Sequence, residues 1–287
     1  MPTEPGADSQ ERSEVPLKVV VIADDSPANR WLIPQIERHH ALQTIVRPDW
    51  AAPRLKPTSG RRSVSLGARV LGRIRAQYFA PRDKSDSARL AQLLCPGDAG
   101  ATPRAPIWTV PAWSINSGEV LERLSELAPD LIIVNGAPLL RPNIFRIPRL
   151  GTLNLHFGIS PDYRGMHTIV TPIQRRDFAR IGATIHFVSE GIDDGPAVVR
   201  LYPALASNDD HVSVEAKILL IAATELNALL AWCTRRSGAV APHGRVLSGP
   251  GVLIRFGDRT ICADVRARLV RRRVPTTSER VERYYDG

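Results

Sequence analysis

The segment "DLIIVNG" at residues 130–136 decides the fold. Its uninterrupted apolar residues predict a strand that is buried on both faces, as in the centre of a parallel sheet. Before it, Ser117 can cap a helix whose apolar residues recur at helical spacing until Pro129 ends it. After it, "GTLNLHF" at residues 151–157 predicts the next strand. This alternation of helix and strand predicts an α/β domain.

The same alternation opens the chain. "LKVVVIADD" at residues 17–25 predicts a buried strand that ends in carboxylates. Ser26 and Pro27 are a capping hydroxyl and a first-turn proline, so they predict a helix, which Pro34 kinks. Residues 42–46 predict the second strand. A strand, a helix and another strand in this order indicate parallel pairing with a crossover.

Further strands are predicted at residues 106–110, 182–188 and 196–204, and a long helix over 211–234. Together these segments predict one open, mostly parallel twisted sheet with helices on both faces. A small C-terminal extension of one helix and short basic strand-like pieces is expected over residues 205–287.

An insertion at about residues 48–105 interrupts this alternation. It is rich in Pro, Gly, Ser and Arg and has two helical stretches, at 65–79 and 85–95. These helices lie at the periphery of the sheet or cover part of the active site, and the sequence leaves both interpretations open. Residues 1–16 are expected to be a disordered tail before a main domain at 17–204.

The composition is that of a folded globular protein. The chain has 287 residues, of which 43% are hydrophobic and 23% charged. The polar N-terminus lacks the apolar core of a signal peptide, and no apolar run reaches the ~18–20 residues of a membrane helix. Cys95, Cys233 and Cys262 have no disulfide or metal-site spacing. We expect a cytoplasmic protein with reduced thiols, no membrane span and no metal.

The net charge of +9 has two interpretations. A basic face attracts an anionic substrate or nucleic acid, whereas an Arg-rich composition needs no such partner. The basic clusters at residues 60–77 and 266–275 are not interleaved with the aromatic side chains of a base-stacking groove. Nucleic-acid binding is therefore disfavoured.

Asn154 and His156 interrupt the predicted strand at a spacing of two. Such residues project from the same face, about 6.5–7 Å apart. Ligands of open α/β sheets bind outside the carboxyl ends of the strands, where this pair is expected. An amide donor and an imidazole suit the developing oxyanion and the proton transfers of an acyl carbonyl. Two satisfied polar groups at a strand end would give the same pattern.

Two loops add to this pair. "GISPDYRG" at residues 158–165 is a shaped turn, because it has Gly at both ends and Pro161. "SEGIDDG" at residues 189–195 places Asp193 and Asp194 at the carboxyl end of a neighbouring strand. A carboxylate there can orient the imidazole or raise its pKa, and solvent-facing turn residues remain the alternative.

The segments at residues 151–165 and 182–199 resemble the folate-dependent formyltransferase family. They carry, in order, an Asn-x-His on a strand, a Pro-containing loop and an Asp in an Ile-Asp-x-Gly turn. The resemblance covers residues 17–47 and 106–204, and implies that 17–204 is a Rossmann-like catalytic domain. It does not cover the insertion.

The resemblance implies that Asn154, His156 and Asp193 are catalytic. Asp193 is preferred to Asp194 because it directly follows the apolar residue of the turn. The implied formyl donor is 10-formyltetrahydrofolate, the acceptor is a primary amine, and no metal takes part. Gly158 departs from the serine that the family often has at this position.

Further site residues are implied by the same resemblance. Arg164 meets a substrate phosphate or carboxylate, or forms a structural ion pair. His167 opens a helix close to the site, His186 is expected in the core or behind the site, and His211 at the surface. The residues expected at the pterin are Gly136, Ala137, Pro138, Leu139, Leu140, Ile159, Ser189, Glu190, Gly191 and Ile192. The residues expected at the substrate are Ser160, Tyr163, Arg164 and His167.

The acceptor amine stays open at this stage. A nucleotide-linked amino sugar is preferred, with hydroxyornithine, glycinamide ribonucleotide and methionyl-tRNA as alternatives. The insertion is unlike the compact glycinamide ribonucleotide enzymes, and the region after residue 205 is unlike the C-terminal barrel of tRNA enzymes. The same residues would also fit a formyltetrahydrofolate hydrolase or a non-catalytic folate-binding protein. A homodimer is compatible with the sequence.

Overall fold

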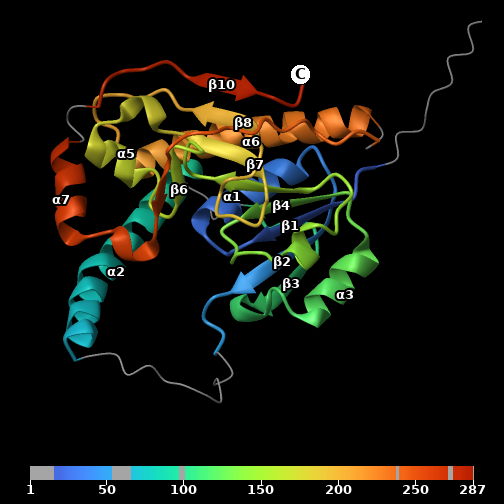
Figure 1. The fold of residues 1–287 in the computed structure, drawn as a ribbon, viewed down its shortest axis with the longest axis horizontal. Coiled ribbons are helices and arrows are strands. Elements are labelled where there is room, and N and C mark those ends of the chain that lie inside the picture. Colours follow the sequence, from blue (N-terminus) through green and yellow to red (C-terminus); the bar gives the residue numbers. More distant parts are fainter. Residues whose placement is uncertain (1–15, 54–65, 97–100, 237–238, 271–273, 287) are drawn as a thin grey trace, which may run out of the picture.

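The computed structural model describes residues 16–53, 66–96, 101–236, 239–270 and 274–286. One open eight-stranded sheet carries helices on both faces (Figure 1), which confirms the predicted fold class. The tail predicted over residues 1–16 lies outside the described residues apart from Pro16. The strands of this sheet are β1 (Val19–Ala23), β2 (Leu42–Asp49), β3 (Ile107–Pro111), β4 (Leu131–Asn135), β5 (Thr152–His156), β7 (Ala183–Phe187), β8 (Ala197–Tyr202) and β10 (Arg280–Arg283).

The sheet is parallel in one half and antiparallel in the other. Its strand order is β10-β8-β7-β5-β4-β1-β2-β3. The five strands from β3 to β5 pair in parallel. The pairs β5–β7, β7–β8 and β8–β10 are antiparallel. The short connection from β7 to β8 accounts for their pairing, because a parallel pair needs a crossover of a dozen or more residues.

Two predicted helices begin at serine caps. In α1 (Pro27–Glu37), the Ser26 hydroxyl accepts a hydrogen bond from the Asn29 amide at 3.4 Å. In α3 (Gly118–Leu127), the Ser117 hydroxyl accepts one from the Val120 amide at 3.4 Å. Each cap satisfies a backbone donor that the first helical turn leaves free.

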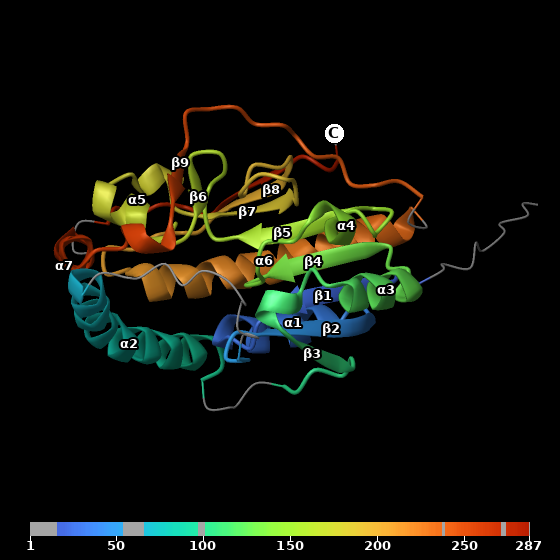
Figure 2. The ribbon, with the colours of Figure 1, turned by 60° about the horizontal axis from the view of Figure 1, so that its bottom comes forward.

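The strands β1, β2 and β4 contribute to a core on either side of the sheet, and helices cover both sides (Figure 2). In β1, Val19 and Val21 join the core beneath α1 and α6 (His211–Arg235), whereas Val20 and Ile22 join the core beneath α3 and α4 (Pro142–Phe145). Side chains of a strand alternate between its faces, so an uninterrupted apolar run is buried on both.

The insertion forms one long helix, α2 (Leu66–Leu94), rather than the two predicted stretches. Pro81 lies inside this helix and does not end it. Leu90 and Leu94 are buried in the core that α1 and α6 also line. The C-terminal half of α2 therefore packs onto the body of the protein.

The described C-terminal residues pair with the rest of the protein through two short strands, β9 and β10. The short strand β6 (Tyr163–Gly165) pairs with β9 (Val252–Ile254). The helix α5 (Val170–Arg175) begins after His167, which was expected to open it. The helix α7 (Ile261–Val270) was not predicted. At the sheet edge, Arg283 of β10 donates two hydrogen bonds to the buried Glu225 carboxylate of α6, at 2.6 and 2.5 Å.

The helix α6 has the length and mean hydropathy of a membrane-crossing helix. However, 67% of its most apolar window is buried inside the protein. Leu219, Leu226 and Leu229 are fully buried against the sheet. We therefore assign α6 as the central core helix.

Candidate functional site

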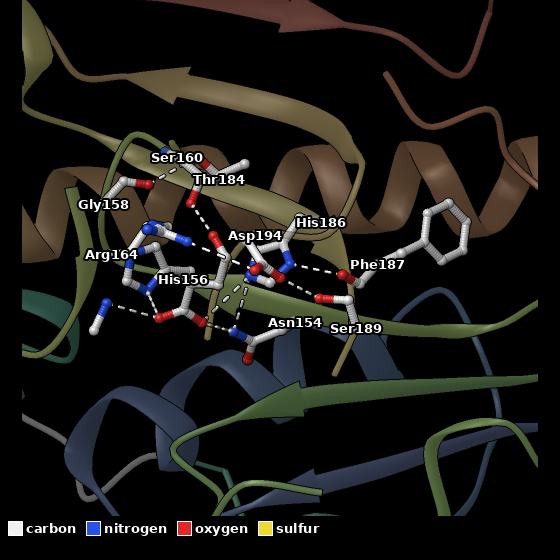
Figure 3. Close-up of polar contacts among 12 residues, drawn as sticks. Asn154, His156, Gly158, Ser160, Arg164, Thr184, His186, Phe187, Ser189 and Asp194 are labelled. Atoms are coloured by element: carbon white, nitrogen blue, oxygen red, sulfur yellow. Dashed lines mark hydrogen bonds and ion pairs between the residues drawn. The ribbon is translucent and has the colours of Figure 1, made fainter. Parts of the chain in front are cut away.

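Polar side chains of β5 and β7 gather on the face of the sheet opposite α6 (Figure 3). Asn154 lies opposite His186, and His156 lies opposite Thr184. Directly opposed residues of an antiparallel pair project to the same face, so all four side chains share it. Leu155, which alternates with them, is buried in the core on the other face. The two-residue spacing in the sequence thus places the amide and the imidazole side by side.

The Asp193 carboxylate is the centre of this group. Its Oδ1 accepts a hydrogen bond from Asn154 Nδ2 at 3.2 Å and lies 3.5 Å from His186 Nε2. Its Oδ2 accepts one from the Gly165 amide at 2.9 Å and lies 3.4 Å from His156 Nδ1. Although burial favours the neutral acid, His186 and His156 lower the pKa of Asp193 to about 2. The carboxylate is therefore a fixed negative charge at neutral pH.

Asp193 reaches the site by a route that the sequence did not predict. Because β7 runs antiparallel to β5, its last residue, Phe187, lies beside Leu153 rather than at the carboxyl end of β5. The connection at residues 188–196 folds back to bring Asp193 to the site. Asp193 has a φ of +48°, which is uncommon for a residue with a side chain, and Ser160 Oγ donates to its carbonyl at 2.8 Å.

Asp194 has a different set of partners. Its carboxylate accepts a hydrogen bond from the Ser189 hydroxyl and lies 3.6 Å from the Arg164 guanidinium. Arg164 thus meets a carboxylate of the protein itself. Of the two adjacent aspartates, Asp193 is the one that lies against the His156 imidazole.

Both ring nitrogens of His156 face acceptors. Nε2 donates to the Tyr163 carbonyl at 2.9 Å, and Nδ1 faces the Asp193 carboxylate. Only the protonated ring can donate to both. Burial nevertheless lowers the pKa of His156, against the opposing charge of Asp193. The expected rise from a neighbouring carboxylate is thus outweighed by desolvation, and the imidazolium gives up its proton readily.

Gly158 makes the contact between His156 and Tyr163 possible. A Cβ atom at residue 158 would lie 2.5 Å from His156 Nε2 and 2.6 Å from the Tyr163 carbonyl oxygen. No side chain fits between these groups. The departure from the usual serine is therefore tied to a loop that closes directly on the imidazole.

His186 holds the amide of Asn154. Its Nδ1 donates to the Phe187 carbonyl at 2.8 Å, which holds the ring with Nε2 towards Asn154 and Asp193. Asn154 Nδ2 lies 3.3 Å from that nitrogen. His186 is 2% exposed, in agreement with its expected place in the core behind the site.

A cavity of about 860 Å³ lies beside this group, at the carboxyl edge of the sheet. Asn154, His156 and Asp193 line it. Four of the residues expected at the pterin also line it, namely Gly136, Ala137, Leu139 and Ile192, and so does His167 of the expected substrate residues.

The other expected ligand residues do not line the cavity. Ile159 is 1% exposed in the interior, and Ser160 is turned towards the Asp193 backbone. Tyr163 is buried, with its hydroxyl donating to Asp177 at 2.9 Å. These three predictions of direct ligand contact fail because the side chains are committed inside the protein. The remaining residues outside the lining are Pro138, Leu140, Arg164, Ser189, Glu190 and Gly191.

One wall of the cavity was missed in the sequence. Asp24 follows β1, Asp86 lies on α2, and His211 and Glu215 lie on α6. Contrary to expectation, His211 is not a surface histidine but part of the lining. The carboxylates after the first strand were visible in "ADDS" at residues 23–26, but no spacing linked them to the two helices. The insertion thus covers part of the cavity through α2.

Several known proteins are similar to this chain. Residues 103–229 match the family described as Formyl transferase. Methionyl-tRNA formyltransferase of Kosmotoga olearia is 35% identical over 106 residues, which cover 37% of this chain and 34% of that protein. The enzyme of the same name from Salinispora tropica is 31% identical over 161 residues, 52% of this chain and 51% of its own length. The chain thus matches about a third to a half of these relatives.

Solved structures share the fold at low sequence identity. A sugar N-formyltransferase from a Shewanella species has a TM-score of 0.54 and 14% identity, covering 88% of this chain and 87% of that one. Glycinamide ribonucleotide transformylase 1 from Symbiobacterium toebii has a TM-score of 0.50 and 16% identity, covering 81% and 95%. No cluster of three potential metal ligands occurs within the described ranges.

Proposed function

We propose that this chain, whose residues 103–229 match the family described as Formyl transferase, moves a formyl group from 10-formyltetrahydrofolate to a primary amine. The observation that supports the reaction is the contact of Asn154, His156 and Asp193 at the wall of one large cavity. The backbone of residues 136–139 and Ile192 line the same cavity and would hold the pterin.

In this proposal the amine nitrogen bonds to the formyl carbon, and the bond from that carbon to the folate nitrogen breaks. Asn154 donates a hydrogen bond to the oxygen on which negative charge develops, and protonated His156 does so when Nε2 exchanges the Tyr163 carbonyl for that oxygen. In the free protein Asn154 Nδ2 contacts Asp193 and His186, so one of these bonds is exchanged for the substrate oxygen. The proton lost by the amine ends on the folate nitrogen.

Asp193 acts through His156 in this reaction. Its ionised carboxylate stabilises the imidazolium and fixes the orientation of the ring. His156 in turn moves the proton, a role that its lowered pKa suits because the ring changes protonation state easily. Because the His156 ring is buried, its attraction to the Asp193 carboxylate and its interaction with the developing negative charge are both stronger than they would be in water.

The acceptor is the finer part of the proposal. The preference for a nucleotide-linked amino sugar stays a prediction. The sequence relatives are methionyl-tRNA formyltransferases, so methionyl-tRNA belongs in the test, although the basic clusters of the sequence lack interleaved aromatic residues. We place the reaction in the cytoplasm, where the three unpaired cysteines stay reduced.

The test is an incubation with 10-formyltetrahydrofolate and a panel of amines, with tetrahydrofolate release followed by absorbance. The panel contains a nucleotide-linked amino sugar, hydroxyornithine, glycinamide ribonucleotide and methionyl-tRNA. Release that depends on an amine, together with a formylated product, supports the proposal. Release at an equal rate without any amine would instead establish a hydrolase. Folate binding with no release under either condition would argue against catalysis with these acceptors.

A further inference from the structure

The wall of the cavity that the sequence did not reveal is acidic. We call Asp24, Asp86 and Glu215, with the neighbouring His211, the acidic subsite. Its members come from the end of β1, from the insertion helix α2 and from the first turns of α6. They line the same cavity as Asn154. Figure 2 shows α2 and the start of α6 at one end of the molecule.

The position of Asp24 shows how far the acidic subsite lies from His156. The side-chain nitrogen Nδ2 of Asn29 donates to the Asp24 carboxylate at 2.7 Å, which fixes the Asp24 side chain. The carboxylate lies against Gly136, where a Cβ atom would be 2.8 Å from its carboxyl carbon. Gly136 follows β4, which separates β1 from β5 in the sheet. Asp24 therefore lies two strand spacings, about 10 Å, from the end of β5 that carries His156.

Asp86 and His211 satisfy each other. His211 Nε2 lies 2.9 Å from the Asp86 carboxylate. Although burial favours the neutral ring, this hydrogen bond and the nearby carboxylates raise the pKa of His211. The two side chains form an ion pair that adds no net charge to the subsite.

Glu215 is the group without a partner. It lies one helical turn beyond His211 on α6, and no group among the described residues donates a hydrogen bond to its carboxyl. Burial raises the pKa of Glu215 to about 7 against the opposing charge of His211, and Asp86 and Asp24 add to the rise. The Glu215 side chain is half-buried, and a carboxyl without a donor that lines a cavity can find its donor in a ligand.

The cations beside the cavity do not offset these carboxylates. Arg259 is paired with Asp83 at 2.8 Å and with Asp264 at 3.4 Å. Burial and nearby arginines lower the pKa of His167 to about 4, so this histidine is neutral. Arg255 stands exposed at the rim, on the segment after β9. A buried phosphate would need free cations, and the described wall around Glu215 offers carboxylates instead.

We propose that the acidic subsite binds a second, positively charged group of the acceptor, so that the substrate is a diamine or a basic amino acid without phosphate. The inference rests on the proposed formyl transfer. One amine of the acceptor is neutral and reacts beside Asn154 and His156, while its ammonium group lies between Asp24 and Glu215. This proposal therefore disfavours a nucleotide-linked amino sugar as the acceptor.

The test compares putrescine with butylamine as acceptors of the formyl group. The two have the same carbon chain, and only putrescine carries a second ammonium. We expect kcat/KM for putrescine to exceed that for butylamine about tenfold or more, beyond the factor of two from its two identical amines. The variant E215Q should remove most of this preference, so that the ratio of the two kcat/KM values falls towards two. E119Q, at an exposed glutamate of α3, is the matched control and should keep the preference.

Binding of putrescine to the folate-free protein separates the two proposals. Calorimetric binding that E215Q abolishes supports the acidic subsite even if no amine is formylated, a result that would refute only the proposed function. Equal rates with putrescine and butylamine in the wild type would refute the subsite while formyl transfer stands. Faster transfer to a nucleotide-linked amino sugar than to putrescine would also overturn it. A glutamine has the size of the glutamate, and thermal unfolding verifies that E215Q is folded.

Discussion

Asp193 and Glu215 are two carboxylates on the wall of one cavity, and their surroundings give them opposite properties. Burial alone would favour the neutral form of both. Asp193 has the Asn154 amide, the Gly165 amide and two imidazoles around it, and its pKa falls to about 2. Glu215 has no such donors among the described residues, and its pKa rises to about 7. Partners rather than depth decide which buried acid is charged.

This difference separates a fixed charge from one that a ligand completes. Asp193 is ionised before any substrate arrives, so it orients the His156 ring and can stabilise the imidazolium when it forms. Glu215 has a pKa of about 7, so near neutral pH a bound positive charge would favour its ionised form. The first property suits catalysis and the second suits recognition of a cation.

Removing the fixed charge should have the largest effect on activity. We expect D193N to lower kcat about a hundredfold or more, because the imidazolium of His156 loses its counter-charge and its orientation. D194N is the matched control, since Asp194 contacts Ser189 and Arg164 rather than the imidazole. Single-turnover rates with 10-formyltetrahydrofolate measure the effect. Equal rates for D193N and the wild type would refute the role of Asp193.

Removing the unpaired charge should raise stability instead. Because the pKa of Glu215 is about 7 in the folded protein and its ordinary value is 4.5, the folded state holds the proton longer than the unfolded state. The free energy of unfolding should therefore fall as pH rises from about 4.5 to 7, by on the order of 3 kcal/mol. Urea unfolding at pH 5 and pH 8 measures this fall.

The same measurement on E215Q sharpens the comparison. The variant should lack that part of the fall and be more stable than the wild type at pH 8. For Asp193 the sign is opposite, because its lowered pKa stabilises the fold above the ordinary value of 3.8, and this contribution is lost as pH falls towards 2. D193N should therefore be less stable than the wild type at pH 7. A stabilised D193N or a destabilised E215Q would contradict the assigned surroundings.

Filling the space at Gly158 should have a moderate effect. A methyl group there would overlap His156 Nε2 and the Tyr163 carbonyl oxygen, so we expect G158A to cost about 1–3 kcal/mol of stability. The displaced imidazole should also lower kcat. G257A, at a glycine with no neighbouring atom within 4 Å of the added Cβ, is the control. An unchanged Tm and kcat for G158A would show that the loop at residue 158 accommodates the methyl group without displacing the His156 ring.

The sequence predicted the residues on one wall of the cavity, Asn154, His156 and Asp193, but not the residues of the acidic wall. Asn154 and His156 are two residues apart on one strand, so local periodicity was enough to place them together. Asp193 was found through the order of motifs, although the route of its loop depended on the antiparallel pairing of β7. Glu215 meets Asp86 only through the packing of α2 against α6, and no local pattern encodes that contact.

Substitution of Arg164 should have the smallest effect, and it tests whether the ion pair between Arg164 and Asp194 contributes to activity. The guanidinium lies 3.6 Å from the Asp194 carboxylate, and both side chains are partly exposed. Such pairs contribute about 0–1 kcal/mol, so R164Q should change Tm little. Its kcat should stay within about threefold of the wild type, because the ion pair lies outside the cavity lining. A large rise in KM for a phosphate-bearing acceptor would instead make Arg164 a substrate ligand. That result would also weaken the contrast between a fixed catalytic charge at Asp193 and a cation-binding charge at Glu215.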